Sequence, residues 1–290
     1  MKISLEQVKT IGEGLLRPEG VMALDDGSLY AADGRGRCAR IGRDGRTSFF
    51  GAVGGAPNGI CIDCHGHCII ANIGNGEVQS LSPDGNHAVL MTQVDGIRMP
   101  SPNFPFIDSR ERLWVSISTK RPDLEDAFRS PAPDGCIVRL HNGTSVIAAE
   151  GIFFANGIAL DPAEQFLYVA ETLQKRILRY PLRGDGSLGP QEIYGPPFLG
   201  PLGFPDGIAF DEAENLWVTF PAWNAIGYID KKGALHIVME DKERRVLHRP
   251  SNICFGGEGR RTAFIGSLDG RNIPCFEVPF PGMRLVHQRN

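Results

Sequence analysis

Six polar residues open six similar segments of the chain, and together their side chains could bind a metal ion. They are Glu19, Asn58, Asn103, Asn156, Asp206 and Ser251. Carboxylate and amide oxygens are hard ligands that suit Ca²⁺, Mg²⁺ or Mn²⁺, whereas zinc usually takes His or Cys. No histidine stands among the six. If the fold brings these side chains together, we expect a site for a divalent cation.

A second interpretation of the same residues is turn chemistry. Asn and Asp before Gly are common in turns, and three of the six positions have this form, at Asn58-Gly59, Asn156-Gly157 and Asp206-Gly207. Glu19 favours the metal site, because Glu is a poor turn former at that position. The spacing by itself leaves both interpretations open.

The six positions belong to an internal repeat that predicts the fold. In each segment, two short apolar runs flank a turn rich in Asp, Gly, Glu or Asn, which is typical of a β-hairpin. The repeats lie at 17–33, 56–72, 101–117, 154–171, 204–220 and 249–266.

The spacing of the repeats predicts an all-β, six-bladed β-propeller formed by residues 1–290 as one domain. The residues before the six polar positions are separated by 39, 45, 53, 50 and 45 residues, which matches four-stranded propeller blades. Equivalent positions in a closed ring lie at one height around its axis, so the six side chains should converge. We expect the chain ends, at 2–10 and 283–289, to close the last blade. Only 240–248 could make two helical turns, and we interpret it as a loop helix.

Composition and charge restrict the partners that we expect. Thirty Lys and Arg against 34 Asp and Glu leave a net charge of −4, which offers no field for a nucleic acid. The N-terminus lacks a secretory apolar region, and no apolar run reaches the roughly 18 residues of a membrane span. We therefore expect a cytoplasmic protein that binds a small-molecule substrate, with neither nucleic acid nor membrane as partner. The oligomeric state cannot be inferred from these features.

The segment Cys61–Cys68 contains a C-x-x-C-H pattern that also occurs at haem attachment and zinc sites. Alignment with the other repeats instead places Cys61 and Cys68 on strands and the residues between them in the hairpin turn. The pattern therefore favours a structural role over both metal interpretations.

Four of the segments resemble the gluconolactonase/regucalcin (SMP-30) family of six-bladed propellers, and the similarity covers nearly the whole chain. They are PEG at 18–20, PNF at 102–104, ANGIALD at 155–161 and PDGIAFDEAENLWV at 205–218. The resemblance implies that Glu19, Asn156 and Asp206 are the metal ligands. It further implies that Asn103 is another ligand or a substrate contact, and that the activity is hydrolysis of a lactone or a related carboxylic ester.

Such a site would use its cation to polarise the carbonyl and to lower the pKa of the attacking water. Asp206 is our candidate for the catalytic base, with a second role as metal ligand. We favour Ca²⁺ as the ion, with Mg²⁺, Mn²⁺ or Zn²⁺ as alternatives. The competing hypotheses are an esterase for organophosphate-type esters and a propeller that binds a metal or ligand without turnover.

The match to sugar-lactone hydrolases is incomplete in the region that selects the substrate. Those relatives typically carry an Arg two residues before the Asn and an acidic residue after the following strand. Here the two places hold Ser101 and, approximately, Lys120 and Arg121. Arg98, Lys120 or Arg121 are therefore candidates to bind a substrate carboxylate. The alternative is that all three are solvated loop charges.

Overall fold

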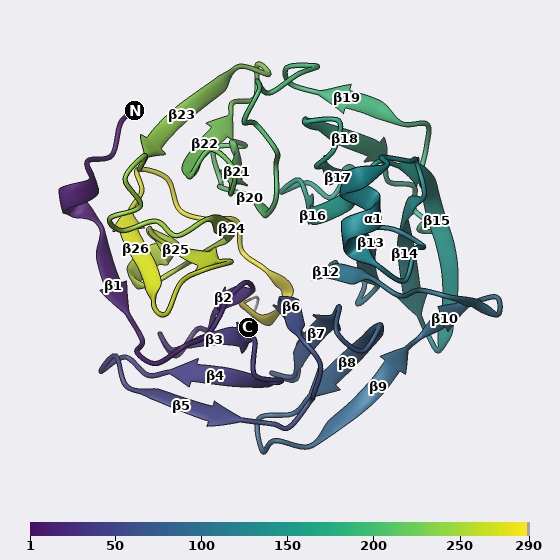
Figure 1. The fold of residues 1–290 in the computed structure, drawn as a ribbon, viewed down its shortest axis with the longest axis horizontal. Coiled ribbons are helices and arrows are strands. Elements are labelled where there is room, and N and C mark those ends of the chain that lie inside the picture. Colours follow the sequence, from purple (N-terminus) through teal and green to yellow (C-terminus); the bar gives the residue numbers. More distant parts are fainter. Residues whose placement is uncertain (289–290) are drawn as a thin grey trace.

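The computed structural model describes residues 1–288, and six four-stranded antiparallel sheets form a ring around a central axis (Figure 1). This arrangement confirms the predicted six-bladed β-propeller. In the first three sheets the strands follow one another from the axis outward. Their bounds are β2 Val21–Ala23, β3 Leu29–Asp33, β4 Arg37–Ile41 and β5 Thr47–Phe50; β6 Pro57–Ile62, β7 Cys68–Asn72, β8 Glu77–Leu81 and β9 His87–Met91; and β12 Pro102–Ile107, β13 Leu113–Ile117, β14 Gly135–His141 and β15 Thr144–Ile152.

The fourth and fifth sheets repeat this order, and the sixth differs. Strands of the fourth and fifth are β16 Ala155–Leu160, β17 Phe166–Glu171, β18 Arg176–Pro181 and β19 Glu192–Tyr194; and β20 Ile208–Phe210, β21 Leu216–Phe220, β22 Ala225–Ile229 and β23 Leu235–Glu240. The sixth contains β24 Pro250–Gly256, β25 Thr262–Ser267, β26 Ile273–Glu277 and, from the N-terminus, β1 Lys9–Ile11. The remaining elements are a small hairpin, one α-helix and three 3₁₀ helices: β10 Gln93–Val94, β11 Ile97–Arg98, α1 Leu124–Arg129, Leu5–Gln7, Glu258–Arg260 and Val286–Gln288.

The predicted hairpins are the two inner strands of each blade. In the fourth blade, β16 and β17 pair Ile158 with Val169, and Asp161 Oδ1 accepts hydrogen bonds from the backbone of the turn that joins them. An Asp at this place caps the turn because its side chain replaces a backbone acceptor. The third and fifth blades use Asp108 and Asp211 in the same way, and each also accepts a hydrogen bond from the indole of a buried Trp in the second strand.

The last blade is closed by the N-terminus alone. Strand β1 pairs with β26, with Lys9 opposite Cys275, so the prediction for 2–10 is confirmed at Lys9 and Thr10, and the strand extends to Ile11. The prediction that 283–289 also closes this blade is wrong for residues 283–288. Residue 289 lies outside the described residues. Residues 283–288 form no blade strand; Met283, Leu285, Val286 and His287 border the axial channel. Their apolar side chains gain more by filling this space than they would at a solvent-facing edge.

The helix prediction for 240–248 is also wrong. Asp241 Oδ2 accepts hydrogen bonds from the backbone of Val246 and Leu247, and this turn replaces a helix. The α-helix is α1, in the loop between the second and third strands of the third blade, where Asp123 caps its N-terminus. Within residues 1–288 no helix is long and apolar enough to cross a membrane.

Candidate active site

The residues that open the repeats gather at one end of the channel. Five of them, Glu19, Asn58, Asn103, Asn156 and Asp206, line a single cavity of about 350 Å³. The sixth, Ser251, is buried beside the ring and its hydroxyl donates to the carbonyl of Glu19 at 3.2 Å. The register of the repeats therefore brings together the set that the sequence predicts.

Close packing of the innermost strands, rather than turn chemistry, accounts for the glycines that follow the ring residues. A Cβ on Gly157 would lie 2.4 Å from the carbonyl oxygen of Asp206, and one on Gly207 would lie 2.5 Å from that of Ser251. Neither glycine has a positive φ. Asn156 lies in the strand β16, and Asp206 stands two residues before β20. The turn interpretation of these positions is thus wrong, and their side chains are free to face the cavity.

Two carboxylates share this cavity, and both are nearly buried. Glu19 is 6% exposed and Asp206 is 7% exposed. Burial raises the pKa of Glu19, although an ion pair with Arg17 acts in the opposite direction. Burial, and then the nearby charge of Glu19, raise the pKa of Asp206 well above its ordinary value. Two like charges in a poorly solvated space favour the binding of a cation between them.

The amide of Asn156 presents an oxygen that has no partner. Its nitrogen donates to Thr172 Oγ1 at 3.2 Å, and that hydroxyl donates onward to the carbonyl of Pro205 at 2.8 Å. This relay fixes the amide so that Oδ1 is left to accept. The Oδ1 atom is buried and has no hydrogen-bond partner within residues 1–288. A buried acceptor of this kind is costly unless a ligand satisfies it.

These donors fit a hard divalent cation. Two carboxylates and one amide oxygen are the ligand types that Ca²⁺, Mg²⁺ and Mn²⁺ prefer. Across residues 1–288, no group of three His, Cys, Asp or Glu side chains is placed to hold a metal. A cation in the cavity would therefore depend on the amide oxygen of Asn156 as well as on Glu19 and Asp206.

Asn103 is held differently from Asn156. Its nitrogen donates to Ser118 Oγ at 2.9 Å, but its Oδ1 already accepts a hydrogen bond from Asn58 Nδ2 at 3.2 Å. Asn58 in turn accepts from Arg17 Nη2 at 2.8 Å. The oxygen of Asn103 is thus less available than that of Asn156, which favours contact with a substrate over metal ligation.

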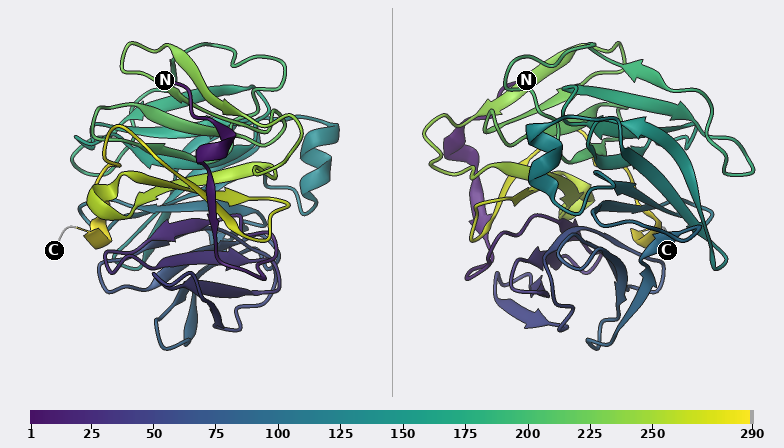
Figure 2. Two further views of the ribbon diagram at one scale, coloured as in Figure 1. Left: turned by 90° about the vertical axis from the view of Figure 1, so that its left-hand side faces the viewer. Right: turned by 45° about the vertical axis from the view of Figure 1, so that its right-hand side comes forward.

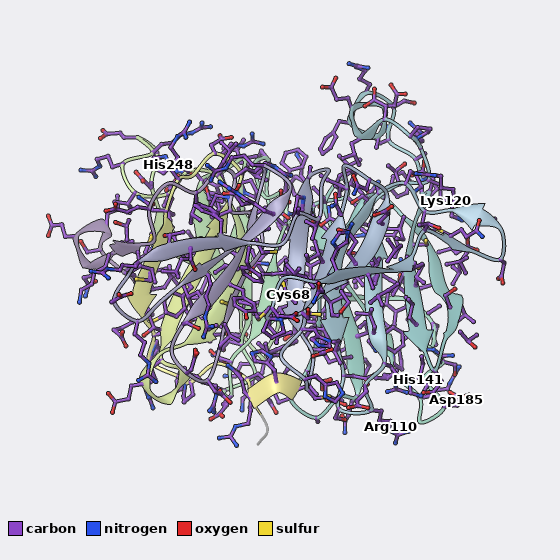
Figure 3. All side chains as sticks on the ribbon, turned by 90° about the horizontal axis from the view of Figure 1, so that it is seen from below. Cys68, Arg110, Lys120, His141, Asp185 and His248 are labelled. Carbon is purple, nitrogen blue, oxygen red and sulfur yellow. The ribbon has the colours of Figure 1, made fainter. Side chains whose placement is uncertain are left out.

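Three residues that the sequence offered as substrate contacts lie outside the cavity lining. Lys120 pairs with Glu150 at 2.5 Å, and Figure 3 shows it on the face that carries α1. Arg121 pairs with Asp134 at 2.9 Å and donates to two carbonyls of the α1 segment. The exposed Arg98 donates to a backbone carbonyl at 3.2 Å. Each of these three side chains thus holds a loop and does not line the cavity.

Among the cavity-wall residues that were not predicted from the sequence, four stand two positions before ring residues. They are Arg17, Phe154, Phe204 and Arg249. The signal was available, because the same offset in every repeat must face the same end of the channel. The helix α1 adds Leu124 and Phe128 to the mouth, with the Phe128 ring 4.8 Å from that of Phe154.

The match to a known family rests on the middle and later blades. Residues 88–269, which are 182 of the 290, match the family model described as SMP-30/Gluconolactonase/LRE-like region. The protein STRICTOSIDINE SYNTHASE-LIKE 6 of Arabidopsis thaliana is 28% identical over 225 residues. That alignment covers 73% of this chain and 58% of the relative, so the chain spans little more than half of that relative's length.

Two solved structures share the fold over nearly the whole chain. A gluconolactonase from Xanthomonas campestris superposes with a TM-score of 0.76 at 21% identity, covering 95% of this chain and 89% of that one. A calcium-binding protein, regucalcin, from Agrobacterium tumefaciens superposes with a TM-score of 0.75 at 16% identity, covering 96% and 95%. At these identities the two structures establish a common propeller fold and nothing further.

Proposed function

The chain belongs to the SMP-30/gluconolactonase/LRE-like family, and on that basis we propose that it is a metal-dependent lactonase, a hydrolase that opens a lactone or a related carboxylic ester. The observation that carries this proposal is the oxygen of Asn156, which is buried without a partner in a cavity that also holds Glu19 and Asp206. A divalent cation would satisfy all three groups. The family name and the name of the Xanthomonas structure support a lactone as substrate.

Glu19, Asn156 and Asp206 are the proposed ligands. The chemistry that such a cation supplies when bound is polarisation of the ester carbonyl and stabilisation of negative charge on its oxygen. The all-oxygen donor set and the calcium-binding protein of the same fold favour Ca²⁺. Mg²⁺ and Mn²⁺ suit the same donors, and Zn²⁺ suits them less because His and Cys are missing from the lining.

Asp206 is the proposed base. Its carboxylate faces the cavity beside the other proposed ligands, so it can take a proton from the water that attacks the ester. Asn103 would orient the substrate through its anchored amide. The phenyl rings of Phe154 and Phe204 would exclude water from the other side of the cavity.

A panel of lactones, with acid release as the readout, tests this function. We expect hydrolysis by the wild type, loss of activity with a chelator, recovery on addition of Ca²⁺, and no activity in Asp206→Ala. Asp44→Ala is the matched control, because that side chain is exposed and lies outside the cavity. Full activity with chelator or in Asp206→Ala would contradict the proposal. Turnover of phosphotriesters alone would favour the organophosphate alternative, and metal binding without any turnover would favour a binding protein.

A further inference from the structure

The cavity wall has a cationic side and an aromatic side. Arg249 and Arg17 come from the sixth and first repeats, which are adjacent where Ser251 donates to the carbonyl of Glu19. Phe154 and Phe204 come from the adjacent fourth and fifth repeats. The proposed metal ligands line the same cavity as these four side chains, so a substrate at the ligands could contact both sides.

The two arginines are held in an unfavourable backbone conformation. Arg17 has a φ of 49° and Arg249 a φ of 58°, in the left-handed region that residues other than glycine seldom adopt. Phe154, at the same offset from its ring residue, has a φ of 65°, so this conformation recurs at the repeat position that lines the cavity wall. Glycine would relieve the strain at both places and would remove the two guanidinium groups from the cavity.

Both guanidinium groups have donors to spare. Arg17 uses Nη2 for Glu19 and Asn58, while its Nη1 is buried without a partner within residues 1–288. Arg249 approaches Asp269 only to 3.7 Å, and both of these side chains are more than 40% exposed. A bound oxyanion could satisfy Nη1 of Arg17 and replace the loose contact of Arg249.

The aromatic side suits a flat apolar group. The ring of Phe128 on α1 packs against Phe154, and Leu124 extends the same surface. Phe204 lies under the ammonium group of Lys175, 4.1 Å from its ring centroid. This side offers shape and apolar contact, whereas sugar hydroxyls would find few hydrogen-bonding partners there.

We propose that Arg17 and Arg249 form an anion subsite, and that the substrate is an amphipathic acid. It would carry a carboxylate at one end, an apolar ring at the other, and the ester between them. That an ester is cleaved rests on the proposed function, whereas the anion subsite rests on the cavity wall alone. If Arg17 and Arg249 bind the carboxylate, Lys120 and Arg121 are not needed for the substrate and can instead hold the α1 loop.

The test separates binding from turnover. The binding probe is a γ-lactam that bears one phenyl group and one carboxylate, compared with its methyl ester, because an amide in the ring resists hydrolysis. Calorimetry is run on the full chain, with chelator and again with excess Ca²⁺. We expect the acid to bind about tenfold to a hundredfold more tightly than the ester, as for a charge-assisted hydrogen-bonded pair. Arg17→Gln and Arg249→Gln should each remove most of this preference.

Arg46→Gln is the control for loss of one positive charge, since its side chain is 91% exposed and lies outside the cavity. It should keep the preference for the acid. Equal binding of acid and ester by the wild type would overturn the subsite even if the variants fail to fold, and so would an equal loss in Arg46→Gln. The corresponding lactones are then assayed for turnover. If the acid still binds more tightly but no lactone is hydrolysed, the lactonase proposal is refuted and the anion subsite is kept. If the acid and ester lactones are turned over equally, the lactonase proposal is kept and the anion subsite is refuted.

Discussion

The two ends of the central channel are built from the same six inner strands, yet they differ in almost every property. The end near α1 holds a cavity of about 350 Å³ with two carboxylates and two arginines. The opposite end retains only about 40 Å³ and is lined by apolar side chains, including Met283 and Leu285 of the C-terminal segment. Figure 2 shows α1 and the 3₁₀ helix Val286–Gln288 on opposite sides of the ring.

The difference lies in the direction of each inner strand. Strand β16 has the polar Asn156 as its second residue, at the cavity, and continues into Ile158 and Ala159, which line the apolar end. The start of such a strand is thus available for chemistry, and its later residues are used for burial. Buried apolar area supplies the free energy that allows polar groups to stay poorly solvated at the other end.

The largest expected effect is on catalysis at the polar end. Asp206→Asn should lower kcat by about 10²–10⁴-fold even at saturating Ca²⁺, because an amide cannot act as the base. Glu19→Gln should lose activity at low Ca²⁺ and regain much of it at high Ca²⁺, because it removes a ligand only. Steady-state kinetics across a Ca²⁺ titration distinguish the two. Equal rescue of both variants by Ca²⁺ would show that Asp206 is a ligand and not the base.

At the apolar end, truncation of a side chain should affect stability and not catalysis. Phe255 lies on β24, is buried and contacts the Trp217 ring. Phe255→Ala should lower the free energy of unfolding by about 3–5 kcal/mol, through lost burial and a cavity. The value of kcat/KM, measured well below the unfolding transition, should change little. A large loss of kcat/KM in a folded Phe255→Ala protein would mean that the two ends are not independent.

A smaller effect is expected from the group that orients Asn156. Thr172→Val keeps the shape of the side chain but removes the hydroxyl that accepts from the amide. We expect Ca²⁺ affinity to fall by about 10–100-fold, the usual cost of losing a group that positions a ligand. Thr262→Val is the control, because its hydroxyl bonds Glu277 away from the cavity. Unchanged affinity in Thr172→Val would remove Asn156 from the proposed ligand set.

The smallest effect concerns stability without metal. The pKa of Asp206 is raised in the folded protein, so the folded state favours its protonated form. The resulting stabilisation is present below the ordinary pKa of Asp and is lost as pH rises through the raised value. In chelator, Asp206→Asn should therefore raise Tm at neutral pH, by roughly 2–4 °C. The difference should vanish in acid. A lower Tm for Asp206→Asn at neutral pH would contradict the cost assigned to this buried carboxylate.

Much of the fold could be predicted because turn and strand residues recur at blade spacing. Local patterns identify the hairpins, and a closed ring then places Glu19, Asn156 and Asp206 at one height without any knowledge of their contacts. The C-terminal segment could not be assigned in this way, since MRLVHQR has the same apolar content whether it pairs at an edge or fills a channel. The position of α1 was missed because a helix of six residues carries no clear period.

The cavity-wall residues two positions before the ring residues were harder to predict. Arg17 and Arg249 adopt positive φ values that an Arg-Pro pair does not indicate, so only their common offset from the ring residues could have pointed to the cavity. Lys120 and Arg121 were better candidates by chain position. Their partners Glu150 and Asp134 lie further along the chain, and only the folded third blade brings these charges together.

The most direct test of the proposed metal site is an anomalous-diffraction experiment on crystals grown with Mn²⁺. We predict one strong peak at the polar end of the channel, within bonding distance of Glu19, Asp206 and the unpartnered oxygen of Asn156, and a much weaker peak in Asp206→Asn crystals grown at the same Mn²⁺ concentration. A fully occupied ion elsewhere, with this cavity empty of metal in the wild type, would contradict it.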